Sequence, residues 1–260
     1  MSGDDWVVVI VNSCHFHSTQ LANEFERGRI GDAALLELTK RLSDVSKDKA
    51  FRLVLMHHPP INHEEAEVQL GREPMFNGIS FLRALEDSGL DWLVIHGHKH
   101  FQRLIRHGDS DHSPMIFGAG SFGASLKGAV ATRTKNQFYI LELETTRDVL
   151  EQERLKARFT SLYWNLTQWN RVEEESQGLP DKCGFDLAKR VEVPKLAKAI
   201  QTVLDGGAPY STWEELVGQI EELKYLTPGD IRALKKTLQN INIIYSPENL
   251  NWFPQQVSKK

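Results

Sequence analysis

The sequence predicts an α/β domain followed by a small all-α C-terminal bundle. In the first half, the largely apolar runs 6–11, 51–56 and 92–95 are typical of buried strands, and segments of helical periodicity separate them. The last third carries helix caps and helical periodicity instead. The 260 residues are 40% hydrophobic and 25% charged, a composition typical of globular chains, which excludes disorder as the main state.

The elements of the first half follow in a strand, helix, strand order. After the first strand, Gly31 and Asp32 open a helix whose apolar residues lie at near-helical spacing, Ile30, Leu35, Leu38 and Leu42. A second helix carries Phe81, Leu82 and Leu85 between the second and third strands. Shorter strands are predicted at 101–106, 114–119, 137–143 and 155–163. This alternation predicts an α/β or mixed layered domain over residues 1–168.

The remaining residues are predicted to form a linker and a helical bundle. Residues 169–184 are polar and contain the breakers Gly178, Pro180 and Gly184, so they are interpreted as the linker. Three helices are expected within 185–260, and because they carry their own caps we expect this bundle to fold by itself. Their signals are the apolar face of Leu196, Ile200, Val203 and Leu204, a capping box of Ser211 with Glu214, and an N-cap at Thr227 followed by Pro228 and Asp230.

Composition restricts the class of protein. The formal net charge of −4 argues against non-specific nucleic-acid binding as the main activity, because such binding needs an excess of Lys and Arg. Cys14 and Cys183 lie far apart in sequence and do not form a framework, so we expect neither a disulfide scaffold nor a cysteine-based zinc module, and we expect reduced thiols. The chain has no apolar run of about 18 residues, and residues 1–5 do not resemble a signal peptide. We therefore expect a cytoplasmic protein with no membrane contact.

The histidines indicate where the chemistry lies. All ten fall between His15 and His112. His57 and His58 directly follow one buried strand, and His98 and His100 follow another. Because ligands of open α/β sheets bind beyond the carboxyl ends of adjacent strands, we expect both strands to lie parallel in one sheet and to bring the two clusters together. Imidazoles in such a place suit zinc, manganese, iron or nickel, and Gly97 is expected to permit the tight turn between the strand and His98.

The segments 54–60, Val-Leu-Met-His-His-Pro-Pro, and 94–100, Val-Ile-His-Gly-His-Lys-His, resemble motifs of the calcineurin-like metallophosphoesterase superfamily. The resemblance covers about residues 6–165 and includes the connecting segments 11–13, 27–30, 77–78 and 118–121. It implies a layered α-β-β-α sandwich that hydrolyses phosphomonoesters or phosphodiesters with two divalent ions such as Mn, Zn or Fe. By this likeness His57 and His98 would coordinate one ion and His100 the other, with His58 and Gly97 in the surrounding shell.

The chain also departs from this family. Its earlier motifs, Asp-x-His, Gly-Asp and Gly-Asn-His, are absent, so the bridging aspartate and the acid histidine have no counterpart and no catalytic residue is assigned. Ser13-Cys14-His15 with Asp32 is rejected as a decayed form of these motifs, because only 24 residues separate Asp32 from His57. The chain therefore resembles the later half of the catalytic domain, as a truncated product, one half of a split enzyme or a degenerate scaffold. We expect it to expose an apolar sheet edge through 6–11 or 51–56, and therefore to be poorly soluble or to associate with another polypeptide.

Three functions are left open by the sequence. The first is a hydrolase, a metallophosphoesterase acting on phosphate esters, for which nucleic acid would enter only as a substrate. The second is a non-catalytic scaffold that binds a protein partner through residues 185–260, a bundle that faintly resembles small death-like adaptor domains of bacterial effector systems. The third is a structural protein with a single zinc ion.

Overall fold

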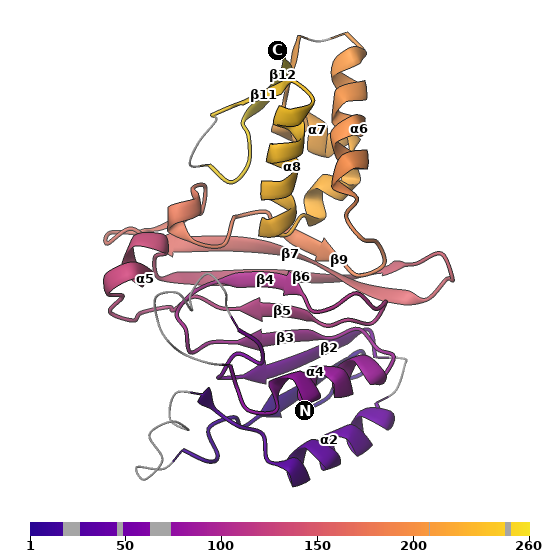
Figure 1. Ribbon diagram of the computed structural model, residues 1–260, viewed down its shortest axis with the longest axis vertical. Coiled ribbons are helices and arrows are strands. Elements are labelled where there is room, and N and C mark those ends of the chain that lie inside the picture. The colour runs from indigo at the N-terminus through magenta and orange to yellow at the C-terminus, as the bar shows by residue number, and fades with distance from the viewer. Residues whose placement is uncertain (18–26, 46–48, 63–73, 208, 248–250) are drawn as a thin grey trace.

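The computed structural model describes residues 1–17, 27–45, 49–62, 74–207, 209–247 and 251–260. Within these residues the chain is a mixed α/β protein with three sheets and six α-helices (Figure 1). No helix in the described part is both long and apolar enough to cross a membrane.

The first sheet confirms the predicted strand, helix, strand alternation. Its strand order is β1-β2-β3-β5-β4, in which only β4 is antiparallel to its neighbour. β2 and β3 pair in parallel, with Met56 opposite His96, as the sequence predicted. The elements of this region are β1 (Trp6–Val11), α2 (Asp32–Ser43), β2 (Phe51–Met56), α4 (Gly78–Asp87), β3 (Leu93–His96), β4 (Arg103–Arg106) and β5 (Met115–Gly118).

Side-chain alternation along these strands divides the core in two. Val94 and Ile116 are buried in one apolar cluster with residues of α2 and α4, so these helices cover one face of the sheet. The neighbouring Leu93 and Phe117 point the other way into a second cluster. The Phe117 ring lies 4.9 Å from the Tyr139 ring and 4.9 Å from the Phe159 ring, which belong to the second sheet.

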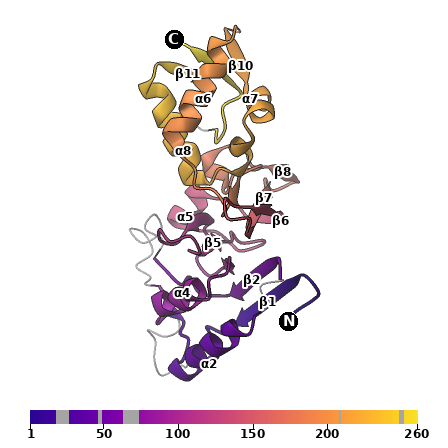
Figure 2. The same cartoon turned by 90° about the vertical axis from the view of Figure 1, so that its right-hand side faces the viewer.

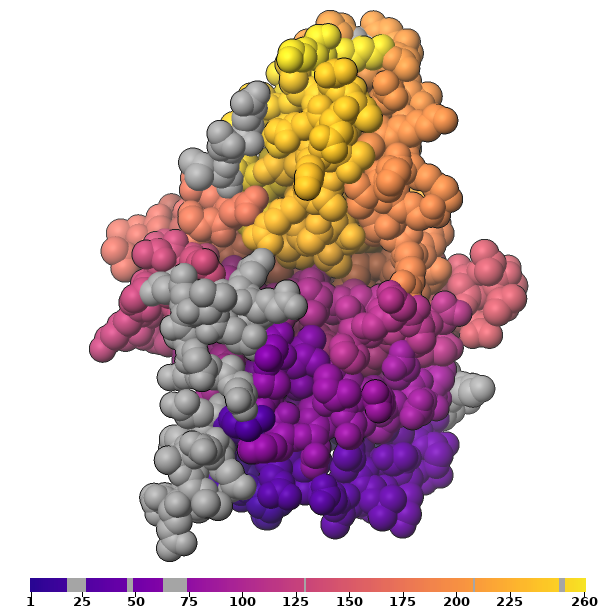
Figure 3. Space-filling view, viewed as in Figure 1, coloured from indigo at the N-terminus to yellow at the C-terminus, as the bar shows by residue number. Residues whose placement is uncertain are grey.

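The second sheet is antiparallel and is formed by the hairpin of β6 (Gln137–Arg147) and β7 (Glu153–Trp164), to which β8 (Trp169–Arg171) and β9 (Gly184–Asp186) are added. The short helices α5 (Gly128–Arg133) and η1 (Glu175–Gln177) flank it. Residues 169–171 of the predicted linker pair with β7, so this part of the linker is a strand of the sheet. The turn of the β6–β7 hairpin protrudes from one side of the molecule (Figure 3).

Part of the first sheet has an exposed apolar face. β1 is the outer strand of this sheet, as predicted for residues 6–11, but its outer edge is not fully unpaired, because Ser2 forms an antiparallel bridge with Val7 and Val8 N donates to Met1 O at 2.8 Å. Val7, Val9 and Val11 pack against the cluster under α2 and α4, so the alternate residues lie on the opposite face. On that face Ile10 is 64% exposed and Trp6 38% exposed. A sheet face of this kind is suited to pack against a further polypeptide segment.

The C-terminal part is not all-α, and the prediction is wrong on this point. Three short strands pair in the order β10-β12-β11 beside helices α6, α7 and α8. Strands of three or four residues are too short to show a period-2 pattern, which is why the sequence did not reveal them. The elements are α6 (Val193–Asp205), β10 (Tyr210–Thr212), α7 (Trp213–Gln219), η2 (Glu221–Tyr225), α8 (Pro228–Asn240), β11 (Ile243–Ser246) and β12 (Gln256–Lys259).

This C-terminal unit lies next to the second sheet (Figure 2), and buried side chains of the two form one cluster. One cluster of buried side chains contains Phe159 of β7, Ile200 of α6 and Leu234 of α8. Trp252 adds polar contacts, because its backbone N–H donates to Glu173 O at 2.8 Å and its Nε1–H donates to Gly178 O at 2.8 Å. The core is therefore continuous across the predicted boundary at residue 184.

The capping residue of α7 is shifted by one position from the prediction. Thr212 is the N-cap, its hydroxyl accepts from Glu215 N at 3.2 Å, and the Glu215 carboxylate accepts from Thr212 N at 2.8 Å. Ser211, the predicted cap, lies in β10 opposite Val257. At α8 the predicted cap is confirmed, since the Thr227 hydroxyl accepts from Asp230 N.

We expect Thr212→Ala to lower the free energy of unfolding by about 1 kcal/mol, because the substitution leaves an N-terminal amide of α7 without its side-chain acceptor. Glu214→Ala is the matched control. Glu214 was the predicted capping partner but forms only an exposed 3.6 Å ion pair with Lys182, so its loss should cost less than about 0.5 kcal/mol. Urea denaturation measures both, and equal losses would contradict the assignment.

Candidate metal centre

The candidate site lies where three parallel strands end side by side. Val11 at the end of β1 is opposite Met56 at the end of β2, and Met56 is opposite His96 at the end of β3. The segments that leave these strands therefore start at one edge of the sheet. They carry Ser13 and Cys14, then His57 and His58, then His98.

Three imidazoles converge at this edge. Nitrogen atoms of His57, His58 and His98 all lie within 4.8 Å of one another. His57 Nε2 and His98 Nδ1 are 3.0 Å apart. Two nitrogens bound to one tetrahedral zinc ion at about 2.05 Å are separated by roughly 3.3 Å, so this pair needs little movement to bind one ion. The predicted meeting of the two histidine clusters is confirmed.

His58 is the buried centre of the cluster. The Ser13 hydroxyl lies 2.9 Å from His58 Nδ1 and accepts from His58 N at 3.2 Å, which fixes the ring orientation. Gly28 packs against this ring, and a Cβ at Gly28 would lie 2.3 Å from His58 Nδ1, while its φ of +67° also favours glycine. His58 Nε2 is buried and has no hydrogen-bond partner within the described residues. A buried nitrogen of this kind fits a metal ligand.

Burial and neighbouring side chains keep the His57 and His58 rings uncharged at neutral pH. Burial, followed by the neighbouring His98, His57 and His17, lowers the pKa of His58 to about 3. Burial, followed by His17 and His100, also lowers the pKa of His57. A neutral imidazole presents the lone pair that coordinates a metal, so both rings are in the binding form at pH 7.

The backbone turn after β3 is achieved differently from the prediction. The left-handed residues are His98, with φ of 71°, and His100, with φ of 53°, whereas Gly97 is not left-handed. Gly97 instead connects the clusters, because its N–H donates to His57 O at 3.1 Å. Left-handed conformations of residues other than glycine are uncommon and gather at functional sites.

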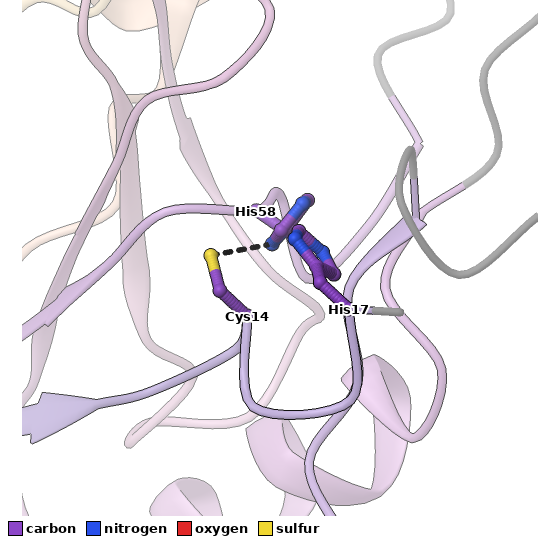
Figure 4. Close-up of side chains that lie close together, drawn as sticks. All are labelled: Cys14, His17 and His58. Carbon is purple, nitrogen blue, oxygen red and sulfur yellow. Dashed lines mark hydrogen bonds between the residues drawn. The ribbon is translucent and has the colours of Figure 1, made fainter. Parts of the chain in front are cut away.

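A second group was missed by the sequence reasoning. Ligand atoms of Cys14, His17 and His58 also lie within 4.8 Å of one another. Figure 4 shows the Cys14 side chain directed toward the His58 ring, with Sγ 3.9 Å from Nδ1. One thiolate and two imidazoles form a donor set typical of zinc. The signal was available, because the strand-end reasoning used for β2 and β3 applies equally to the residues after β1.

The ligand atoms of these two groups suit one metal ion. By themselves they do not suit two adjacent metal ions that share a bridging ligand. His100, predicted to bind the second ion, is exposed and belongs to neither group, although it is close enough to influence the pKa of His57. Neither group found in the described residues contains a carboxylate. Neutral imidazoles lack the charge and the bridging oxygen that two adjacent divalent ions need.

Comparison with known families concerns the C-terminal unit. Residues 189–240 match the family wHTH-Calcineurin_assc, a calcineurin-associated winged helix-turn-helix domain. The match covers α6, β10, α7 and α8, and the hairpin of β11 and β12 that follows is in the position of a wing. No curated protein matches the chain. We call residues 193–259 the C-terminal unit below.

Proposed function

We propose that this chain is part of a metal-dependent phosphoesterase of the calcineurin-like type, with the α-β-β-α sandwich of that family. The observation that supports it most is the convergence of His57, His58 and His98 at adjacent ends of parallel strands, with 3.0 Å between His57 Nε2 and His98 Nδ1. Phosphate esters are anionic and hydrolyse slowly, and divalent ions, when bound, neutralise phosphoryl oxygens and lower the pKa of a water nucleophile.

The residues of the chain have defined roles in this proposal. His57 and His98 would each supply a ring nitrogen to the ion, and His58 is oriented by Ser13 and held against Gly28. His100 is the candidate ligand for a second ion. Carboxylates to bridge the pair would come from another segment, and the exposed apolar face around Trp6 and Ile10 offers a surface on which such a segment can pack.

Hydrolysis of bis(p-nitrophenyl) phosphate with Mn²⁺ tests the proposal. We expect little turnover by the 260-residue chain and metal-dependent turnover when a segment carrying Asp-x-His, Gly-Asp and Gly-Asn-His is fused to it. His57→Ala should abolish that activity, and His107→Ala, which changes a histidine outside both groups, should retain it. Equal turnover by the His57→Ala fusion and the parent fusion would overturn the proposal.

The second candidate is a non-catalytic scaffold that uses the C-terminal unit to bind a protein partner. The specific observation in its favour is that the candidate metal groups in the described residues contain no carboxylate. Calorimetric titration separates the two functions. A folded chain that binds neither Mn²⁺ nor Zn²⁺ would favour the scaffold and contradict the phosphoesterase proposal.

A further inference from the structure

Four aromatic side chains form a cluster on the surface of the second sheet. Trp169 is at its centre, stacked on Phe122 at 5.3 Å and 28° and in edge contact with Phe138 at 4.8 Å and 80°. The ring of Trp164 lies 5.4 Å from that of Trp169. Phe122 is 68% exposed, and the other three rings are half-buried. We call these four residues the aromatic cluster.

The aromatic cluster is connected to the edge of the first sheet that carries the histidines. β5 pairs in parallel with β3, with Gly118 opposite His96, and Ala119 N donates to His96 O at 2.7 Å. The segment that carries Phe122 therefore begins at the carboxyl ends of the parallel strands, as does the segment that carries His98. Figure 1 shows α5, which follows this segment, at the end of the molecule toward which the arrows of β3 and β5 point.

The chain around the aromatic cluster has an unusual charge pattern. Residues 112–141 and 154–172 contain no Asp or Glu, although the whole chain has a net charge of −4. The first stretch carries Lys127, Arg133 and Lys135, all exposed. The second ends near the exposed Arg171, which pairs with Asp181 at 3.0 Å. The segments that build the aromatic cluster are therefore cationic in an otherwise acidic chain.

An exposed ring in a cluster built from segments that carry cations and no carboxylates suits a ligand that has both flat π faces and negative charge. An aliphatic or an acidic ligand surface would not require stacked rings on the protein. The bases of a nucleic acid, in contrast, stack on aromatic side chains, and its phosphates pair with Lys and Arg. We propose that the aromatic cluster binds bases of a single-stranded oligonucleotide, and that its phosphodiester backbone extends from there toward the histidines. The hydrolytic part of this inference rests on the proposed function, whereas the binding part does not.

Fluorescence anisotropy of a labelled oligothymidylate of about 15 nucleotides tests the binding, with the full chain in EDTA so that no metal is needed. We expect Phe122→Ala to weaken binding by roughly 5- to 100-fold, in line with the loss of one stacked base, and Phe122→Trp to retain it. Leu150→Ala is the matched control, since Leu150 is equally exposed, at 72%, in the distant β6–β7 turn. Circular dichroism verifies that each variant is folded.

An abasic oligomer of the same length separates stacking from charge. We expect it to bind the parent chain more weakly than oligothymidylate and to be insensitive to Phe122→Ala. The inference is overturned if the parent chain does not bind oligothymidylate, if the abasic oligomer binds as tightly, or if Phe122→Ala and Leu150→Ala bind equally. The last result is also the one expected for binding through the C-terminal unit alone.

Failure of the oligonucleotide-binding inference can be distinguished from failure of the proposed phosphoesterase function. Loss of aryl phosphate hydrolysis with intact, Phe122-dependent oligonucleotide binding would reject the phosphoesterase and retain the binding site. Metal-dependent aryl phosphate hydrolysis without oligonucleotide binding would reject the binding site and retain the enzyme.

Discussion

Replacing His98 by alanine should weaken the binding of Zn²⁺ or Mn²⁺ to this chain by more than about 100-fold. The reason is that His98 is one of the three imidazoles that form one of the two candidate groups in the described residues, with its Nδ1 3.0 Å from His57 Nε2. Loss of a group that merely orients a ligand costs about 10- to 100-fold in metal affinity, and loss of the ligand itself should cost more. His57→Ala should behave in the same way. Isothermal titration calorimetry on the untagged chain measures the affinity.

Two other histidines serve as controls, and a third tests the ligand assignment made from the sequence. His107 and His112 belong to neither group, so their alanine variants should bind the ion like the parent chain. His100→Ala discriminates between the prediction from sequence, which made His100 a ligand, and the three-imidazole group, which does not contain it. Parent-like binding by His98→Ala would contradict the site altogether.

Cobalt substitution distinguishes the two overlapping groups. If Cys14 takes part, Co²⁺ bound to the chain should show thiolate-to-metal charge-transfer absorption that Cys14→Ser removes. If the ion is held by His57, His58 and His98, Cys14→Ser should leave both the spectrum and the affinity unchanged. His58 belongs to both groups, so its substitution does not discriminate.

The buried strands and their pairing were predictable because their signal is local and strong. The runs that became β1, β2 and β3 are apolar over four to six residues, and the helix between β2 and β3 implies a parallel crossover. That inference was sufficient to bring His57 and His98 together. The three-stranded sheet of the C-terminal unit was not predictable, since β10, β11 and β12 have only three or four residues and are stabilised by pairing between distant segments.

Details of the site depended on contacts that are distant in sequence. The central role of His58 follows from Ser13, 45 residues earlier, and from the close approach of Gly28. Cys14 and His17 join the site because β1 is the neighbour of β2, a pairing that makes the loop after β1 adjacent to His58. His100 follows His98 by two residues, yet the left-handed turn leaves it outside the group. Spacing along the chain does not determine which of these side chains reach the site.

Substitution of Arg154 by methionine should lower the free energy of unfolding by about 3 to 5 kcal/mol, the cost of leaving a buried charge without its partner. Arg154 joins the two sheets, because its Nε and Nη2 each donate to the Asp91 carboxylate at 2.9 Å. Both side chains are almost fully buried, with 6% and 2% exposed. The Asp91 carboxylate also accepts from Leu155 N at 2.9 Å, which it would still do after the substitution.

Arg147→Ala is the matched control for this prediction, because Arg147 lies in the same β6–β7 hairpin but pairs with Glu151 in water, and its loss should cost less than about 0.5 kcal/mol. Adding Asp91→Asn to Arg154→Met should recover part of the stability, since the Asp91 charge is removed and a neutral amide oxygen can still accept from Leu155 N, whereas Asp148, which pairs with Arg154 at 3.3 Å, loses this partner in both variants. Urea denaturation measures all three variants.

Asp91 precedes β3 whereas the histidines follow it, so the folded Arg154→Met variant should bind metal like the parent chain. Equal losses for Arg154→Met and Arg147→Ala would show that the buried pair does not hold the two sheets together.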